Sequence, residues 1–196
     1  MCFRSLVGMT MLAIPLLASA ADRLVEGKPD SEVRVLIYED LQCSDCAVFR
    51  KMLDEKLLPR YAGTVAFEHR DFPLAKHAWA RKAAIASRHF ARTDRDLAIA
   101  WRRYALEHLA DMTENSFNAR LGEFAREHGA DPDHAVSALD DPNLTALVQQ
   151  DFDEGVARGI ARTPTALVNG QPFIETFSAE EISKAIDSEL AALKAK

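Results

Sequence analysis

The chain of 196 residues is poor in cysteine, with three such residues, and has fewer basic side chains (24) than acidic ones (30). The formal charge of −6 argues against a nucleic-acid-binding protein, because neutralising phosphates requires clustered Lys and Arg. Glycine and proline number only eight each and 48% of residues are apolar, which excludes a disordered or collagen-like chain. This length favours one domain with room for an inserted segment.

Long apolar runs are missing after the first twenty residues. Residues 1–20 carry Arg4 as their only charge, an apolar run over 6–17 and small residues at 18–20. This pattern predicts a cleaved secretory signal peptide, and the run is too short for a membrane span of about 20 residues. An uncleaved N-terminal anchor is the alternative. Because Ala21 follows the predicted cleavage site, no lipid-anchored cysteine is expected, and the predicted location is the periplasm.

Only two cysteines, Cys43 and Cys46, follow the predicted signal peptide, and two residues separate them. In an oxidising compartment this spacing predicts a redox-active pair. A structural staple is one alternative, but a loop of about four residues constrains the unfolded chain by only about 2 kcal/mol. A zinc site is another, and it would need two more ligands, which no other cysteine or histidine pair at ligand spacing supplies. We therefore expect neither a metal nor another cofactor.

The cysteine pair is expected at a junction between a strand and a helix. β-forming residues dominate from Glu32 to Asp40, and a helical stripe follows Cys46 and ends at Pro59; its apolar members are Val48, Phe49, Met52, Leu53 and Leu57. Cys43 would then lie at a helix N-terminus, where unpaired N–H groups and the helix dipole favour a thiolate. This makes Cys43 the expected nucleophile and Cys46 the resolving thiol.

The middle of the chain predicts helices. A strand-like run covers residues 64–71, and four helical stripes follow it, the second opened by a capping box of Thr93 with Asp96. Two aromatic residues on these stripes, Trp79 and Trp101, are expected to pack in the core.

The last part of the chain predicts a hairpin and a helix. Strand signals at 165–168 and 171–174 flank Asn169-Gly170, a two-residue hairpin turn, and a final helix begins at Ser178 with Glu181 in a capping box. The order is βαβ, helical insert, ββα. It indicates an α/β fold with a mixed sheet and helices on both faces.

These features resemble the thioredoxin fold and, within it, the DsbA-like thiol-disulfide oxidoreductases that carry an inserted helical domain. The resemblance rests on the segments DLQCSDC at 40–46, RDFPL at 70–74, GIARTPT at 159–165 and VNG at 168–170. It implies a thioredoxin-like mixed sheet built from two parts, residues 21–74 and 159–196, with an all-helical insert at 75–158.

The resemblance also implies a substrate site. In this family the proline that matches Pro164 is cis and lies against the cysteine pair, and the preceding residue, here Thr163, presents its backbone to the substrate chain. Sequence alone would favour a trans bond, because only about 5–6% of X–Pro bonds are cis in folded proteins.

One departure from the family concerns the residues between the cysteines. Ser44-Asp45 replaces the Pro-His of strongly oxidising relatives, and the Asp45 carboxylate is expected to oppose a thiolate on Cys43 and raise its pKa. This predicts a potential less oxidising than the roughly −120 mV of DsbA. The alternative is that Asp45 only favours the helix N-terminus from a solvated position.

A second departure is Ile37, at the place where many relatives bury an acidic proton-transfer residue. Strand alternation puts Glu39 on the same face, so Glu39 is a candidate substitute, although a solvated carboxylate at the strand end is the favoured alternative. A third is the lack of further cysteines, so electrons must pass to another protein. The histidines show no ligand motif and are expected on the surface or in packing: His69, His77, His89, His108, His128 and His134.

These observations predict an exported protein disulfide oxidoreductase that acts through Cys43 and Cys46, with Thr163 and Pro164 binding substrate and Ser44, Asp45 and Glu39 tuning the thiol pKa. Its partners would be cysteine-containing exported proteins and a membrane redox protein. The direction stays open: an oxidase would need a quinone-linked partner and a reductase a membrane electron donor. The alternatives are a non-enzymatic binding or chaperone module with a passive disulfide, and a metal-binding protein.

Overall fold

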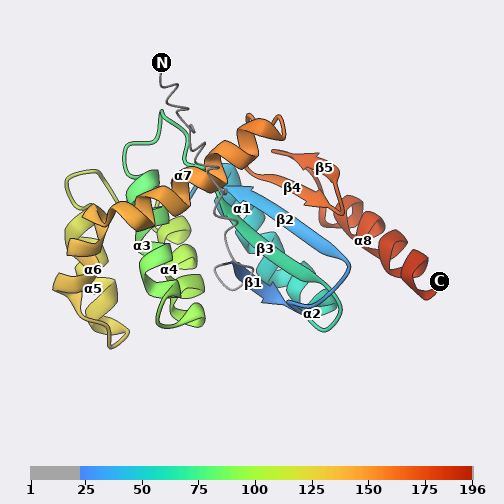
Figure 1. Ribbon diagram of the computed structural model, residues 1–196, viewed down its shortest axis with the longest axis horizontal. Helices are drawn as coiled ribbons and strands as arrows, with labels where there is room; N and C mark the ends of the chain where they lie inside the picture. The colour runs from blue at the N-terminus through green and yellow to red at the C-terminus, as the bar shows by residue number, and fades with distance from the viewer. Residues whose placement is uncertain (1–22, 196) are drawn as a thin grey trace, which may run out of the picture.

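A five-stranded mixed sheet forms the centre of the computed structural model, which describes residues 23–195 (Figure 1). The strands are β1 (Leu24–Gly27), β2 (Arg34–Glu39), β3 (Ala66–Asp71), β4 (Thr165–Val168) and β5 (Gln171–Ile174), in the order β1-β3-β2-β4-β5. The β2–β3 pair is parallel and the other pairs are antiparallel. The predicted mixed sheet is confirmed, whereas the short edge strand β1 was not predicted. The predicted signal peptide lies outside the described residues.

A single helical segment connects β2 to β3. It consists of α1 (Ser44–Met52), the π-helical turn η2 (Leu53–Leu57) and α2 (Leu58–Tyr61). The prediction that Pro59 ends this helix is wrong, because Pro59 lies in the first turn of α2, where its missing N–H costs nothing. Val48 also leaves the predicted buried stripe, since it is 71% exposed.

Helices fill the chain between β3 and β4. They are α3 (Ala80–Ala91), α4 (Arg95–Glu107), α5 (Phe117–Glu127), α6 (Pro132–Ser137), the 3-10 turn η3 (Ala138–Asp140) and α7 (Pro142–Ala157). In Figure 1, α3 to α6 lie together beside the sheet and α7 runs from them back to the strands. Trp79 and Trp101 are buried among these helices, as predicted. The cap of α4 is Asp94, not Thr93, because the Asp94 carboxylate accepts from the N–H groups of Asp96 and Leu97.

The C-terminal part follows the local signals of the sequence. Asn169 and Gly170 have φ values of 44° and 97° between β4 and β5, the left-handed pair that a two-residue hairpin turn requires. The last helix, α8 (Ala179–Lys194), begins with the predicted capping box of Ser178 and Glu181.

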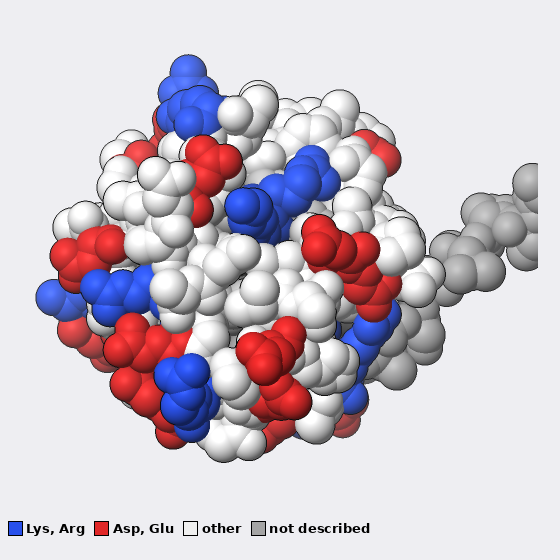
Figure 2. Space-filling model, turned by 90° about the vertical axis from the view of Figure 1, so that its left-hand side faces the viewer, with Lys and Arg blue, Asp and Glu red and all other residues white. Residues whose placement is uncertain are grey.

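Two layers of side chains hold the sheet in place. Apolar residues of α1, η2 and α8 pack on one face of the strands, with Ile37, Leu53 and Ile182 fully buried among them. Beyond Ile37, at the carboxyl ends of β2 and β3, the same face carries Glu39 and Asp71, which pair with Arg88 of α3 and Arg102 of α4. On the outer face that carries α5 and α6, acidic and basic side chains are interspersed rather than gathered by sign (Figure 2).

Candidate active site

The two cysteines lie where β2 gives way to α1, as the sequence predicts. Cys43 is the residue that precedes the first turn of α1, with extended backbone angles, and Cys46 lies inside that turn. Both are in the reduced form, and Cys43 keeps 7% of its surface exposed while Cys46 has none. Of the two cysteines, only Cys43 therefore reaches the surface.

The loop before β4 reaches the same point. The Thr163–Pro164 peptide bond is cis, and the carbonyl oxygen of Thr163 lies 3.4 Å from the Sγ of Cys43. The hydroxyl of Thr163 is buried and has no hydrogen-bond partner among the described residues. The structure thus brings together Cys43, Cys46, Thr163 and Pro164, the residues that the sequence singled out.

The surroundings of Cys43 stabilise its thiolate. A hydrogen bond from the Cys46 thiol lowers the pKa of Cys43 most, burial opposes it, and the backbone N–H groups of Cys46 and Asp45 lower it further, to about 5. A thiolate at the N-terminus of a helix also interacts favourably with the helix dipole. Cys43 is therefore largely ionised at neutral pH.

Cys46 has the opposite character. Burial raises its pKa well above the usual thiol value, the hydrogen bond to Cys43 raises it further, and so do the negative charges of Cys43 and Glu39. The backbone N–H of Asp40, 3.4 Å from the Cys46 Sγ, only partly offsets these effects. Cys46 therefore stays protonated while Cys43 is a thiolate.

The residues between the cysteines, Ser44 and Asp45, are exposed in the first turn of α1. The shift in the pKa of Cys43 is opposite to the one predicted from Asp45, because the backbone N–H of Asp45 helps to lower it while the Asp45 side chain is exposed to solvent. The structure thus matches the alternative of a solvated acid at a helix N-terminus.

Glu39 is buried, with 3% of its surface exposed, so the expectation of a solvated carboxylate at the strand end is wrong. Its carboxylate accepts from Arg102 Nη2 at 3.0 Å and forms a short contact with the His69 ring. Burial would raise the pKa of Glu39, but Arg102 and His69 outweigh it and lower the pKa to about 2. Glu39 is thus a fixed negative charge. Ile37, two residues before Glu39 on β2, is buried and apolar.

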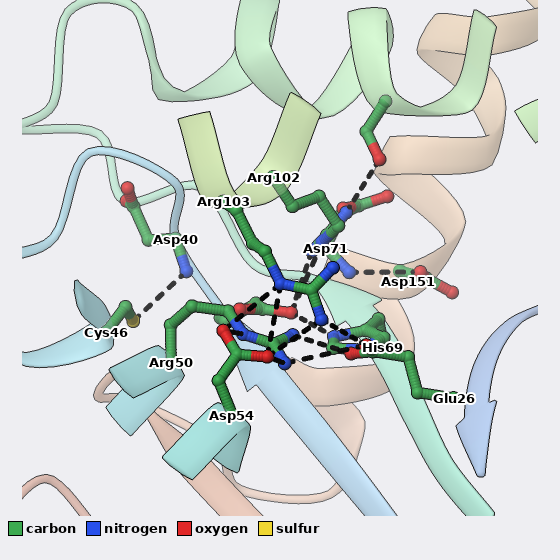
Figure 3. A network of polar contacts seen from close by, with 12 residues as sticks. Glu26, Asp40, Cys46, Arg50, Asp54, His69, Asp71, Arg102, Arg103 and Asp151 are labelled. Atoms are coloured by element: carbon green, nitrogen blue, oxygen red, sulfur yellow. Dashed lines mark hydrogen bonds and ion pairs between the residues drawn. The ribbon is translucent and has the colours of Figure 1, made fainter. Parts of the chain in front are cut away.

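Glu39 contacts His69 and Arg102, which belong to a network of charges between the sheet and the helices. Figure 3 shows this network, with His69, Arg102 and Asp71 labelled. His69 bridges Glu39 and Glu26, and Arg102 joins Glu39 to Asp71. Burial would lower the pKa of His69, but the two carboxylates raise it. Sequence reasoning missed His69 and Arg102. The run Glu68-His69-Arg70-Asp71 was the available signal, because charges on a strand flanked on both sides must be buried in pairs.

Asp40 organises the loop before Cys43 and was not singled out either. Its buried carboxylate accepts hydrogen bonds from the backbone N–H groups of Gln42 and Leu74, both at 2.7 Å, and lies 2.8 Å from the ring of His77. These bonds connect the cysteine loop to the segment after β3.

A protein-family model described as "Thioredoxin" matches residues 19–188, nearly the whole chain. The chain belongs to the thioredoxin family. Among solved structures, oxidised BdbD from Bacillus subtilis is 27% identical, with a TM-score of 0.78 over 88% of this chain and 95% of that one. Alpha-DsbA1 of Wolbachia pipientis is 18% identical, with a TM-score of 0.77 over 94% and 98% of the two chains. These similarities show that the chain has the fold of BdbD and of DsbA-like proteins.

A curated sequence gives a different kind of similarity. The Na(+)/H(+) antiporter NhaA of Herminiimonas arsenicoxydans is 24% identical over 170 residues, which are 84% of this chain but 25% of the antiporter. This thioredoxin-family chain therefore spans about a quarter of that relative. In the described part, 23–195, no helix combines the length and the apolar character that a membrane span needs.

Proposed function

We propose that this protein is an exported oxidase of protein thiols, which passes a Cys43–Cys46 disulfide to cysteine-containing proteins in the periplasm. The observation that favours oxidation over reduction of substrates is the lowered pKa of Cys43, about 5, beside a protonated Cys46. A stabilised thiolate favours the reduced form of the pair, and this makes the disulfide form a stronger oxidant.

The reaction begins at the exposed sulfur. A substrate thiolate attacks Cys43 Sγ in the disulfide, the sulfur–sulfur bond breaks, and Cys46 leaves and takes up a proton. A second substrate thiolate then attacks the substrate sulfur of the mixed disulfide and releases Cys43 as a thiolate. Two electrons pass from the substrate to the protein. The low pKa of Cys43 speeds this second step, because thiols of lower pKa leave faster.

Substrate binding is proposed for Thr163 and Pro164. Their support is the 3.4 Å separation of the Thr163 carbonyl from Cys43 Sγ, which places this backbone beside the sulfur that would be attacked. In the reverse direction, Cys46 would resolve the mixed disulfide by attacking Cys43.

Glu39 is proposed as the main residue that tunes the pKa values of the two thiols. Its carboxylate is held ionised by Arg102 and His69 and raises the pKa of Cys46. A protonated Cys46 can donate its hydrogen bond to Cys43, so Glu39 would stabilise the Cys43 thiolate through Cys46. Ser44 and Asp45 would act through the helix N-terminus on which they lie.

The cycle requires a second partner. No cysteines besides Cys43 and Cys46 follow the predicted signal peptide, so a membrane redox protein linked to quinones is proposed to reoxidise the pair. Export rests on the apolar run and small residues of the first twenty positions.

The test is the redox equilibrium of the protein, without residues 1–20, against glutathione buffers, measured by the mass shift on thiol alkylation. A Cys43 pKa of about 5 predicts a potential between those of thioredoxin (thiol pKa about 7, about −270 mV) and DsbA (about 3.5, about −120 mV). A value from about −120 to −200 mV supports the oxidase, whereas one below about −250 mV would indicate a reductase. A pair that never titrates would contradict the enzymatic role.

A further inference from the structure

A groove of about 430 Å³ opens beside the cysteine pair. One side is formed by residues of α1, and the other by the segment between β5 and α8 together with the first turn of α8. The lining residues are Asp45, Val48, Phe49, Met52, Glu175, Thr176, Phe177, Ser178 and Glu181. The groove therefore starts at a residue that lies between the two cysteines.

The far side of the groove is attached to the proposed substrate-binding loop. The backbone N–H of Glu175 donates a hydrogen bond to the carbonyl oxygen of Pro164 at 2.8 Å. Glu175 therefore lies next to Pro164, and a peptide that places a cysteine on Cys43 and runs along Thr163 and Pro164 would pass it. Its residues next to the cysteine would enter the groove.

The interior of the groove is apolar. Val48 is 71% exposed, and the rings of Phe49 and Phe177 pack with centroids 5.6 Å apart. Such a surface favours an apolar side chain of a bound peptide, because burying it removes apolar area from water.

The rim of the groove carries charge of one sign. Among the described residues that line it, the charged ones are Asp45, Glu175 and Glu181, and none is Lys, Arg or His. Glu175 is neutralised by Arg162 at 2.6 Å, whereas no ion pair of Asp45 or Glu181 occurs among residues 23–195. Hydrogen bonds at the capping box lower the pKa of Glu181, so it is ionised at neutral pH.

We infer that this groove selects substrate segments in which a lysine or arginine and an apolar residue lie next to the reacting cysteine. The inference rests on the proposed function, since the groove matters for substrates only if Cys43 exchanges disulfides. A cation between Asp45 and Glu181 gains Coulomb attraction, and an anion there is repelled. The selection acts on the encounter and on the mixed disulfide, not on the sulfur chemistry.

The test uses three dithiol peptides of the same sequence except for one position, two residues from the first cysteine, which is Lys, Gln or Glu. The oxidised protein is mixed with each peptide, and the rate of peptide disulfide formation is measured by chromatography. Each rate is divided by that of the same peptide with bis(2-hydroxyethyl) disulfide, which removes the effect of the neighbouring charge on the peptide thiol. At low salt the Lys peptide is expected to react about fivefold faster than the Glu peptide.

Variants connect this ratio to the groove. In the double variant Asp45→Asn with Glu181→Gln the Lys-to-Glu ratio is expected to fall to about one, and Gln at 181 can keep the capping box. The control is Glu114→Gln, the same loss of charge at an exposed residue outside the groove, which should keep the full ratio. High salt, about 1 M, should also reduce the wild-type ratio toward one, since the Debye length is then about 3 Å.

Two results would overturn the inference: equal normalised rates for the three peptides, or a ratio that survives in the double variant. In either case the peptides would still be oxidised, and the proposed function would stand. If none of the peptides is oxidised, the proposed function itself fails, and the charge selection fails with it.

Discussion

The sulfur of Cys43 lies 3.4 Å from the carbonyl oxygen of Thr163, a residue 120 positions later in the chain. The whole helical region between β3 and β4 separates the two in sequence. The contact between this carbonyl oxygen and the Cys43 sulfur therefore exists only when both parts of the sheet are folded together. The properties of Cys43 should consequently report on the tertiary structure.

The first prediction concerns the ionisation of Cys43. In the reduced folded protein, alkylation by iodoacetamide should increase with pH around a midpoint near 5, the lowered pKa of this thiol. In denaturant the midpoint should return to about 8.5, the ordinary value for cysteine. The measurement is the alkylation rate between about pH 3 and 10, by mass spectrometry. A folded midpoint near 8.5 would contradict the assignment of Cys43 as the activated nucleophile.

The second prediction concerns the donor to the thiolate. Replacing Cys46 by Ala removes the hydrogen bond that contributes most to the low pKa of Cys43, so the pKa of Cys43 should rise. Cys46→Ser keeps a hydroxyl donor and should give a smaller rise. The same alkylation profile measures both. If the two variants show identical midpoints, a hydrogen bond from residue 46 is not the cause.

The third prediction concerns the buried charge of Glu39. Glu39→Gln removes one negative charge of the network and leaves the buried positive charges of Arg102 and His69 without this partner. The free energy of unfolding should therefore fall by about 3 kcal/mol or more. The matched control is Glu55→Gln, whose pair with Lys51 at 3.8 Å is exposed and should contribute less than about 1 kcal/mol. Urea unfolding measures both. Equal effects would mean that burial of the network does not matter.

The fourth prediction follows from the pKa values of the network. Glu39 and Asp71 have pKa values of about 2 in the folded protein, below their ordinary values of 4.5 and 3.8. A lowered pKa contributes stability that is present above the ordinary value and is lost as pH falls toward the folded value. The free energy of unfolding should therefore decrease between about pH 4.5 and 2. His69 has a raised pKa, and its contribution is lost instead as pH rises through that value.

The measurement for this acid prediction is urea unfolding at about pH 7, 4.5 and 3. An urea midpoint that stays constant down to about pH 3 would contradict it. In Glu39→Gln the slope between about pH 4.5 and 3 should be shallower, because one of the titrating carboxylates is gone.

The fifth prediction compares two helical glycines. A Cβ on Gly155, in α7, would lie 2.6 Å from the Phe72 ring, whereas a Cβ on Gly122, in α5, would lie 3.6 Å from Pro132, an ordinary contact. Gly122→Ala should raise the free energy of unfolding by up to about 1 kcal/mol through helix propensity. Gly155→Ala should lower it by about 1–3 kcal/mol through overpacking. Thermal unfolding that moves both variants in the same direction would refute this difference.

Local signals explain which elements could be predicted. The hairpin at Asn169-Gly170 and the cap at Ser178 depend on residues within one turn, and both are confirmed. Pro59 as a helix end, Thr93 as a cap and Val48 on the buried stripe were predicted from local patterns and were wrong. The first two have local causes. In the first case a π-helical turn lets the helix continue, and in the second the neighbouring Asp94 provides the cap.

The partners of the buried charged residues could be identified only from the tertiary structure. Glu39 looks like a solvated strand end because nothing near it in the chain is a partner, yet Arg102 from α4 and His69 from β3 lie against it. The strand β1 was missed for a related reason. It is only four residues long, and it brings Glu26 to His69. The residues of β1 alone do not predict this contact.

The sequence by itself determined the cysteine pair at a strand-to-helix junction, the helical region between the two parts of the sheet, and the family. These follow from residue spacing, periodicity and short motifs, which are properties of neighbouring positions. Only the tertiary structure decided that burial raises the pKa of Cys46 and that Glu39 is a buried fixed charge. Electrostatic energies depend on distances through space and on exclusion of water, and both are set by segments far apart in the chain.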